Sequence, residues 1–294
     1  MSEVDPDRIN RQLQALARER HGRDTQALQV LYAIEGFLRR LSASRYRDRL
    51  VLKGAMLLAA LDARRTTRDA DLSAHGIAND EGSVARVVSE IATVALPVSD
   101  ELVFDPASIR TEPMREAASY TGVRAKLPAG LGAARLIVAL DFSFGDPGEA
   151  REIRYPEILG GPGIPLHAYP IERVLAEKIA TTIERGELNT RDRDFADVWV
   201  LSRVHRIDAV SLRSTLQAVA GHRGHPVPPL SQALAHMPDR QRSYDALRRR
   251  ASFTIAPPER WADLLAQVIT FVDPLLDDQD GGLSEWDQQR SRWV

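Results

Sequence analysis

The stretch from Leu50 to Ser73, LVLKGAMLLAALDARRTTRDADLS, constrains the fold more than any other part of the chain. Its pattern predicts a buried strand, a glycine turn, a short helix, a polar turn with paired arginines, and a second strand that carries Asp69 and Asp71. Side chains two residues apart on a strand point to the same face, with α-carbons about 6–7 Å apart. Two carboxylates so placed suit Mg²⁺ held against phosphates, which the glycine turn would cradle. The alternative is a cluster of surface salt bridges between Arg64 and Asp71.

The composition is that of a globular protein, with 44% hydrophobic and 27% charged residues among 294. The net charge of −2 provides no global basic field, so a nucleic-acid contact would need a local patch. The chain has no cysteine, which excludes disulfides, thiolate metal sites and cysteine nucleophiles. Its first residues are polar and no apolar run is long enough to span a bilayer, so we expect a cytoplasmic protein.

Hydrophobic periodicity changes near Tyr169 from a mixed α/β pattern to an all-helical one. Before this residue we expect helices over 5–48 and 79–96, and strands at 102–104, 120–125, 135–144, 153–155 and 165–168. After it we expect helices near 170–186, 191–204, 208–220, 229–236, 239–250 and 258–276. The predicted domains are 1–168 (N-terminal helices and a mixed-sheet core), 169–277 (helical) and 278–294 (a polar tail, either loose or docked on a partner). The predicted fold class is α+β.

The most strand-like run is Arg135–Phe144, RLIVALDFSF. It is apolar on both faces, which predicts a central strand of a covered sheet. An ionised carboxylate at Asp141 is costly there unless it is paired or holds a metal. A strand beside Asp69 and Asp71 would make Asp141 a third acidic ligand. The alternative is that Asp141 ends the strand and caps the turn at Gly145.

Lys178 lies on an otherwise apolar helical stripe. Such a lysine either snorkels to solvent or points its ammonium at a polar site. In the next predicted helix, Asp194 and Asp197 share one face with Arg191. These aspartates are surface charge, partners of Arg191 and Arg193, a general base, or a bridge to Lys178 inside a cleft.

The order of these motifs resembles the AbiEii/AbiGii toxin family of nucleotidyltransferases, which includes abortive-infection and MenT-type toxins. The matching residues are Lys53-Gly54, Arg65-x-Thr67-x-Asp69-x-Asp71, Glu177-Lys178 and Arg191-x-Arg193-Asp194-x-x-Asp197. The resemblance implies a polymerase-β-like nucleotidyltransferase core, a helical C-terminal domain, a cognate antitoxin, and for some members nucleotide transfer to the 3′ end of tRNA.

The resemblance implies a role for each matching residue. Asp69 and Asp71 hold Mg²⁺, and Asp194 or Asp197 positions Lys178 or assists proton transfer. Asp141 lies outside the matching motifs, and the strand pattern alone makes it a candidate third ligand. Nucleoside triphosphate is bound by Lys53, Gly54, Arg65, Thr67 and Lys178. The family usually has Lys-Gly-Gly-Ser/Thr where this chain has Lys53-Gly54-Ala55-Met56, so the hydroxyl that contacts the triphosphate is missing. Ala55 also restricts the turn.

Two clusters of arginine are candidates for RNA contact. One comprises Arg39, Arg40, Arg45, Arg47 and Arg49, which alternatively form a solvated helix face, and the other Arg240, Arg242, Arg248, Arg249 and Arg250. Phosphate contacts from such patches make binding salt-dependent. Two rival functions fit the same residues: nucleotide transfer to a protein or small molecule, and a nucleotide- or RNA-binding module that has lost turnover.

Overall fold

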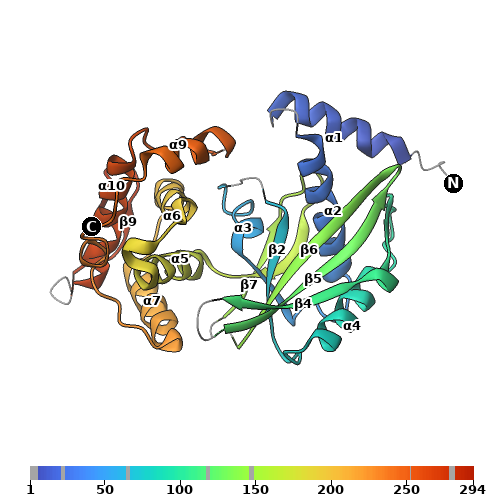
Figure 1. Cartoon of the computed structure of the whole chain (residues 1–294), viewed down its shortest axis with the longest axis horizontal. Coiled ribbons are helices and arrows are strands. Elements are labelled where there is room, and N and C mark those ends of the chain that lie inside the picture. Colours follow the sequence, from blue (N-terminus) through green and yellow to red (C-terminus); the bar gives the residue numbers. More distant parts are fainter. Residues whose placement is uncertain are drawn as a thin grey trace. The chain divides into compact units, whose positions relative to one another are not determined.

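The computed structural model describes residues 6–20, 24–63, 67–116, 120–145, 149–251, 253–277 and 282–294 (Figure 1). The chain forms two compact units. The sheet unit contains residues 1–60 and 66–169, and the helical unit contains residues 61–65 and 170–294. The domain limits predicted from the sequence stay a prediction. The predicted α+β class, with N-terminal helices, a mixed sheet and a helical C-terminal part, is confirmed.

The sheet unit is built on a mixed sheet with the strand order β3-β5-β6-β2-β1-β8-β7, and β4 pairs with β5. Strands β2 and β6 run parallel to each other, as do β1 and β8, whereas β1 is antiparallel to β2 and β5 is antiparallel to β6. The strands are β1 (Leu50–Lys53), β2 (Asp69–Ala74), β3 (Leu102–Phe104), β4 (Arg110–Glu116), β5 (Tyr120–Leu131), β6 (Ala134–Phe144), β7 (Arg151–Tyr155) and β8 (Ile164–Ala168).

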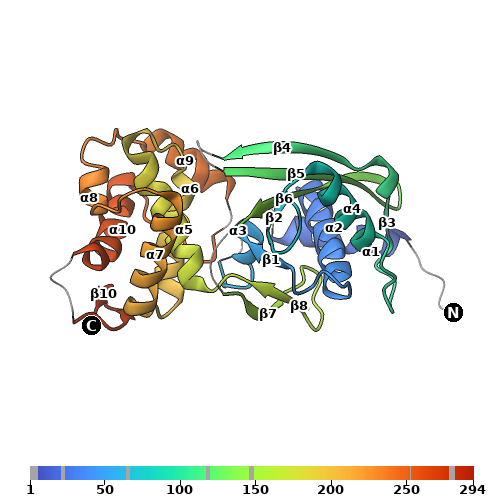
Figure 2. The ribbon, with the colours of Figure 1, turned by 90° about the horizontal axis from the view of Figure 1, so that it is seen from below.

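The helices of the sheet unit pack on its strands and on one another. They are α1 (Pro6–Arg20), α2 (Thr25–Ser42), α3 (Gly54–Leu57) and α4 (Glu81–Ala92). Helix α2 packs against β6 and β8, α4 packs against β4 and β5, and the sheet curls around both helices (Figure 2). On β6, Leu136, Val138 and Leu140 are buried, whereas Ile137 is 50% exposed. The expectation that β6 is covered on both faces is therefore wrong near Ile137, because the sheet here is antiparallel with one open face.

The predicted strands leave a gap between residues 104 and 120, but the structure has an edge strand there, β4, which among the described residues pairs with β5. Its polar residues and Pro113 gave little strand signal. Proline lacks a backbone N–H and is tolerated in sheets mainly at edges. The predicted N-terminal helical region also divides, into α1 and α2.

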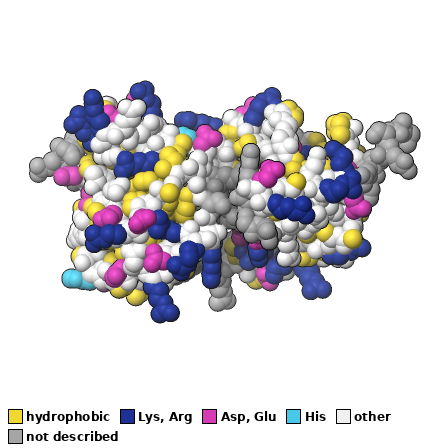
Figure 3. Space-filling model, turned by 90° about the horizontal axis from the view of Figure 1, so that it is seen from above, with side chains coloured by type: hydrophobic (Ala, Val, Ile, Leu, Met, Phe, Trp, Pro, Cys, Tyr) yellow, Lys and Arg dark blue, Asp and Glu magenta, His cyan; other side chains and the backbone are white. Residues whose placement is uncertain are grey.

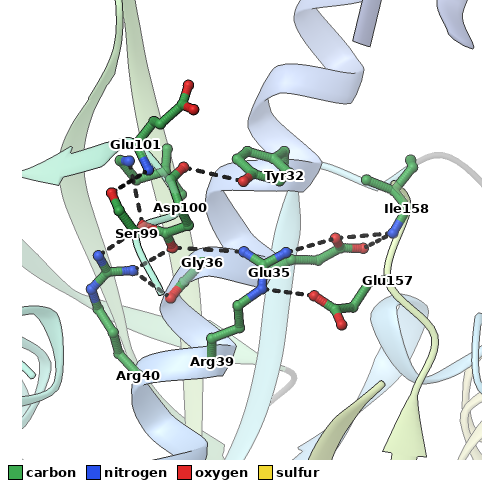
Figure 4. A network of polar contacts seen from close by, with 11 residues as sticks. Tyr32, Glu35, Gly36, Arg39, Arg40, Ser99, Asp100, Glu101, Glu157 and Ile158 are labelled. Carbon is green, nitrogen blue, oxygen red and sulfur yellow. Dashed lines mark hydrogen bonds and ion pairs between the residues drawn. The ribbon is translucent and has the colours of Figure 1, made fainter. Parts of the chain in front are cut away.

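A buried polar network holds α2 against two loops of the sheet unit (Figure 4). Arg40 donates two hydrogen bonds to Asp100, at 2.7 and 3.0 Å, and Arg39 donates to Glu157 at 2.8 Å. Glu35, fully buried, accepts the backbone N–H of Ile158. Arg39 and Arg40 thus form neither the predicted solvated face nor a free nucleic-acid surface, because buried carboxylates bind them.

The helical unit packs α5 (Ile171–Arg185) against α6 (Asp192–Val204) and α7 (Ala209–Arg223). Helix α10 (Trp261–Leu276) lies against α6, α7 and the short α8 (Leu230–Ala233), and α9 (Gln241–Arg250) packs on α6. These helices match the predicted ranges closely, because their apolar stripes recur at helical spacing.

Residues 282–294 fold onto the helical unit. The predicted polar tail, loose or docked on a partner, is therefore not found over these residues. Strands β9 (Trp286–Asp287) and β10 (Arg292–Trp293) form a hairpin on α10. The rings of Trp286 and Trp293 pack on Phe271, with centroids 4.8 and 5.2 Å away. Each indole N–H donates to a backbone carbonyl at 2.8 Å. Burying two aromatic rings outweighs the polarity of the surrounding sequence.

No helix within the described residues is long and apolar enough to cross a membrane. On the face drawn in Figure 3, Lys and Arg side chains are interspersed with acidic and apolar ones. This distribution agrees with the net charge of −2.

Candidate active site

Four charged residues form one row across four neighbouring strands of the sheet unit. Lys53 on β1 pairs with Asp71 on β2, Asp71 with Asp141 on β6, and Asp141 with Arg124 on β5. Directly paired residues on neighbouring strands have side chains on the same face. Asp69, two residues before Asp71, shares that face. The sheet therefore gathers the three aspartates predicted from the sequence on one surface.

Thr67 lies beside this row and is bonded to Asp69. Thr67 is 8% exposed, and its hydroxyl donates to Asp69 Oδ1 at 2.7 Å. This contact holds one carboxylate oxygen of Asp69 in place. Arg65, predicted to bind nucleotide, and Arg64, the alternative partner of Asp71, lie outside the described residues.

The glycine turn packs directly on Asp71. Gly54 has φ +64, and a Cβ at this position would lie 1.8 Å from Asp71 Oδ2. Both the left-handed backbone and this approach require glycine. The ammonium of Lys53 lies 5.9 Å from the ring centroid of Tyr169. The turn thus places Lys53 and Gly54 beside the aspartates, in agreement with the pairing of Lys53 with Asp71 across β1 and β2.

Met56, which departs from the family pattern, belongs to the core. It is 1% exposed, and the Tyr155 hydroxyl donates to its sulfur at 3.9 Å. Position 56 therefore contributes packing, and its side chain is not on the surface that carries the aspartates.

Asp141 is paired with an arginine. Arg124 donates from Nε to Oδ1 at 2.7 Å and from its terminal nitrogen to Oδ2 at 2.6 Å. Hydrogen bonding to Asp141 raises the pKa of Arg124, against the opposing effect of burial. Strand β6 continues to Phe144, so Asp141 does not end the strand, and the capping interpretation is wrong. Among the described residues no three His, Asp or Glu side chains form a ready metal cluster, and a third ligand at Asp141 stays a prediction.

Arg124 was not recognised in the sequence. Its signal was indirect: a buried carboxylate in an apolar strand requires a cation, and Arg124 and Lys126 alternate with apolar residues in the adjacent strand. Lys126 itself binds Glu112 at 2.8 Å.

In the helical unit, Lys178 on α5 lies between two aspartates of α6. Its ammonium donates to Asp194 at 2.9 Å and to Asp197 at 2.7 Å. The three side chains are 12%, 12% and 4% exposed. Lys178 does not snorkel to solvent, and two carboxylates hold its charge in a nearly buried position.

Further ion pairs surround this trio. Glu177 accepts from Arg173 at 2.6 Å and also from Arg223 on α7. Arg240, predicted as part of an RNA-binding cluster, instead donates to Asp192 at the start of α6. The prediction for Arg240 is therefore wrong, because the side chain is 15% exposed and holds a buried carboxylate.

The strand aspartates, with Lys53 paired to Asp71 and Gly54 packed against it, form the arrangement that the sequence predicted for a site that handles phosphate groups. A sequence model of the family described as nucleotidyl transferase AbiEii toxin, type IV toxin–antitoxin system, matches residues 36–288. The chain belongs to this family and is a nucleotidyltransferase of a toxin–antitoxin system. The resemblance seen in the sequence is confirmed.

No curated protein sequence matches the chain significantly. Two solved structures from Helicobacter pylori are similar at 16% identity over 71% of this chain. One is JHP933, of which 78% is covered with a TM-score of 0.42. The other is described as a candidate nucleotidyltransferase, of which 80% is covered with a TM-score of 0.41.

Proposed function

We propose that this toxin transfers nucleotides from a nucleoside triphosphate to the 3′ end of an RNA and so blocks translation. The proposed acceptor is a tRNA. The observation that carries the proposal is the position of Asp69 and Asp71 on one sheet face, with Lys53 paired to Asp71. A cognate antitoxin, implied by the family, would restrain the reaction.

The donor set on this face suits Mg²⁺. Carboxylate oxygens are its preferred protein ligands, and proteins usually hold it with one or two carboxylates plus substrate phosphates. Asp69 and Asp71 provide those two. When bound, one metal ion would activate the attacking hydroxyl and another would neutralise charge on the leaving pyrophosphate.

The chain's own residues supply binding and orientation. Thr67 orients Asp69 through its hydrogen bond, and Gly54 lets the turn lie against Asp71. Lys53, Arg65 and Lys178 would bind the triphosphate. Asp194 and Asp197 hold the ammonium of Lys178, so that it needs no reorganisation when phosphate arrives.

The acceptor is proposed to contact exposed arginines of α9, namely Arg242, Arg249 and Arg250. Such contacts release counterions, so RNA affinity should fall steeply with salt. Salt-insensitive RNA binding would contradict this assignment.

The test is incubation of the purified protein with total tRNA, Mg²⁺ and each labelled NTP in turn. Wild-type protein should label RNA, Asp69→Ala should not, and the exposed Asp105→Ala should behave as wild type. Absence of incorporation with every nucleotide would support the binding-module alternative. Label on protein would support the other rival, and incorporation surviving Asp69→Ala would refute the site.

A further inference from the structure

The ion pair between Arg124 and Asp141 uses both oxygens of the carboxylate. The two hydrogen bonds, at 2.7 and 2.6 Å, form the parallel arrangement in which guanidinium binds carboxylate most strongly. The Asp141 side chain is 10% exposed and that of Arg124 is 34% exposed. The carboxylate is therefore nearly buried, and its partner reaches it from the open face.

This pair lies within the row that carries the proposed metal ligands. Asp141 pairs with Asp71 across β2 and β6, and Arg124 pairs with Asp141 across β5 and β6. The hydrogen bonding of Arg124 to the Asp141 carboxylate is the main cause that raises the pKa of Arg124, and the charge of Asp69 adds to it. Arg124 thus interacts electrostatically with both Asp141 and Asp69.

A divalent cation at Asp141 would have to compete with this guanidinium. Both oxygens already accept charged hydrogen bonds, and a dication beside Arg124 would be repelled in a partly buried setting. Asp69 and Asp71 would then be its carboxylate ligands. Two carboxylates alone leave most of an octahedral coordination sphere to water and phosphate oxygens.

We propose that Arg124 is a positioning residue that withholds Asp141 from the metal, so that Asp69 and Asp71 alone bind it and the triphosphate supplies the missing oxygens. This inference rests on the proposed function. It predicts that the metal binds weakly to the free protein and tightly only together with the nucleotide.

The test measures Mn²⁺ binding by the loss of the free-ion electron paramagnetic resonance signal, without nucleotide and then with a non-hydrolysable NTP analogue. Wild-type protein should bind Mn²⁺ weakly alone and much more tightly with the analogue. Asp71→Asn should abolish binding in both conditions. Equal affinity with and without the analogue would contradict the proposal.

Two matched pairs of variants distinguish the freeing of Asp141 to bind metal from the mere loss of a charge nearby. Arg124→Gln should tighten Mn²⁺ binding by about tenfold, the scale of outer-shell effects on metal sites. Lys126→Gln removes a charge from the same strand face and should change affinity far less. Asp141→Asn should weaken Mn²⁺ binding no more than Glu112→Gln, which removes the carboxylate that accepts from Lys126 on the same strand pair.

The outcomes are decisive in either direction. If Asp141→Asn weakens Mn²⁺ binding as strongly as Asp71→Asn, Asp141 is a ligand and the proposal is wrong. If Arg124→Gln does not fold, as judged by circular dichroism, the comparison of Asp141→Asn with Glu112→Gln decides alone. Mn²⁺ binding that is indifferent to both Asp69→Asn and Asp71→Asn would overturn the metal site itself, and with it this inference. Normal metal binding without nucleotide incorporation would refute only the proposed reaction.

Discussion

Gly54 and Asp71 are in such close approach that a Cβ at residue 54 would lie 1.8 Å from the aspartate Oδ2. The glycine also has φ +64, a left-handed conformation that costs other residues about 1–2 kcal/mol. The turn therefore packs directly on the carboxylate, and the missing side chain of Gly54 makes room for the proposed metal ligand Asp71.

Gly54→Ala should reduce nucleotide incorporation by about 100-fold or more, because a displacement of about 1 Å at a reacting group has that effect. It should also lower the melting temperature. Part of this loss should disappear in an Asp71→Ala background, where the clashing carboxylate is gone. A double-mutant cycle measured by thermal unfolding checks the coupling, and strict additivity would show that the two side chains do not interact.

Met56→Ser restores the hydroxyl of the usual family pattern, yet it should not improve nucleotide affinity. The side chain is buried and faces the core, so shortening it should cost about 2–5 kcal/mol. Met56→Leu, which keeps the volume, should cost less than about 1.5 kcal/mol. Denaturant unfolding and nucleotide titration of both variants provide the measurement, and tighter nucleotide binding by the serine variant would disprove the assignment.

The sequence predicted the part of the site that depends on local pattern. Asp69 and Asp71 share a strand face because of strand geometry alone, and Gly54 lies beside them because the intervening segment is short. The link between Arg124 and Asp141 depends on the register of β5 against β6, which no local pattern specifies. Trp286 and Trp293 were visible as isolated aromatic residues, but their common neighbour Phe271 lies far away in the sequence.

Residues 282–294 should be required for a stable helical unit. Trp286 is 2% exposed, so Trp286→Ala should cost about 3–5 kcal/mol. Val294→Ala, at a half-exposed side chain, should have little effect. Thermal unfolding of both variants tests this directly. A protein truncated after Asp277 that melts like the full chain would rule out a structural role for the hairpin.

Asp80 caps α4 and should make stability depend on pH at acidic values. Its carboxylate accepts the backbone N–H of Ser83 at 2.8 Å, and this bond lowers its pKa from 3.8. A lowered folded-state pKa means that the contribution is present above the unfolded value and is lost as pH falls through the folded value. Asp80→Ala should therefore melt lower than wild type at neutral pH, with the difference shrinking below pH 3.8. Asp80→Asn, which caps without titrating, is the control; a difference that is constant with pH would contradict the linkage.

The Lys178 ammonium bonds two carboxylates, so its loss should damage stability and activity by separable routes. Lys178→Met leaves Asp194 and Asp197 facing each other nearly buried, which should cost about 3–5 kcal/mol. Adding Asp194→Asn and Asp197→Asn removes the repulsion and should recover much of the stability, measured by denaturant unfolding. Incorporation of labelled nucleotide should remain absent in the stabilised triple variant, because the proposed phosphate ligand is still missing. Recovery of both properties together would mean that Lys178 serves the fold and not the reaction.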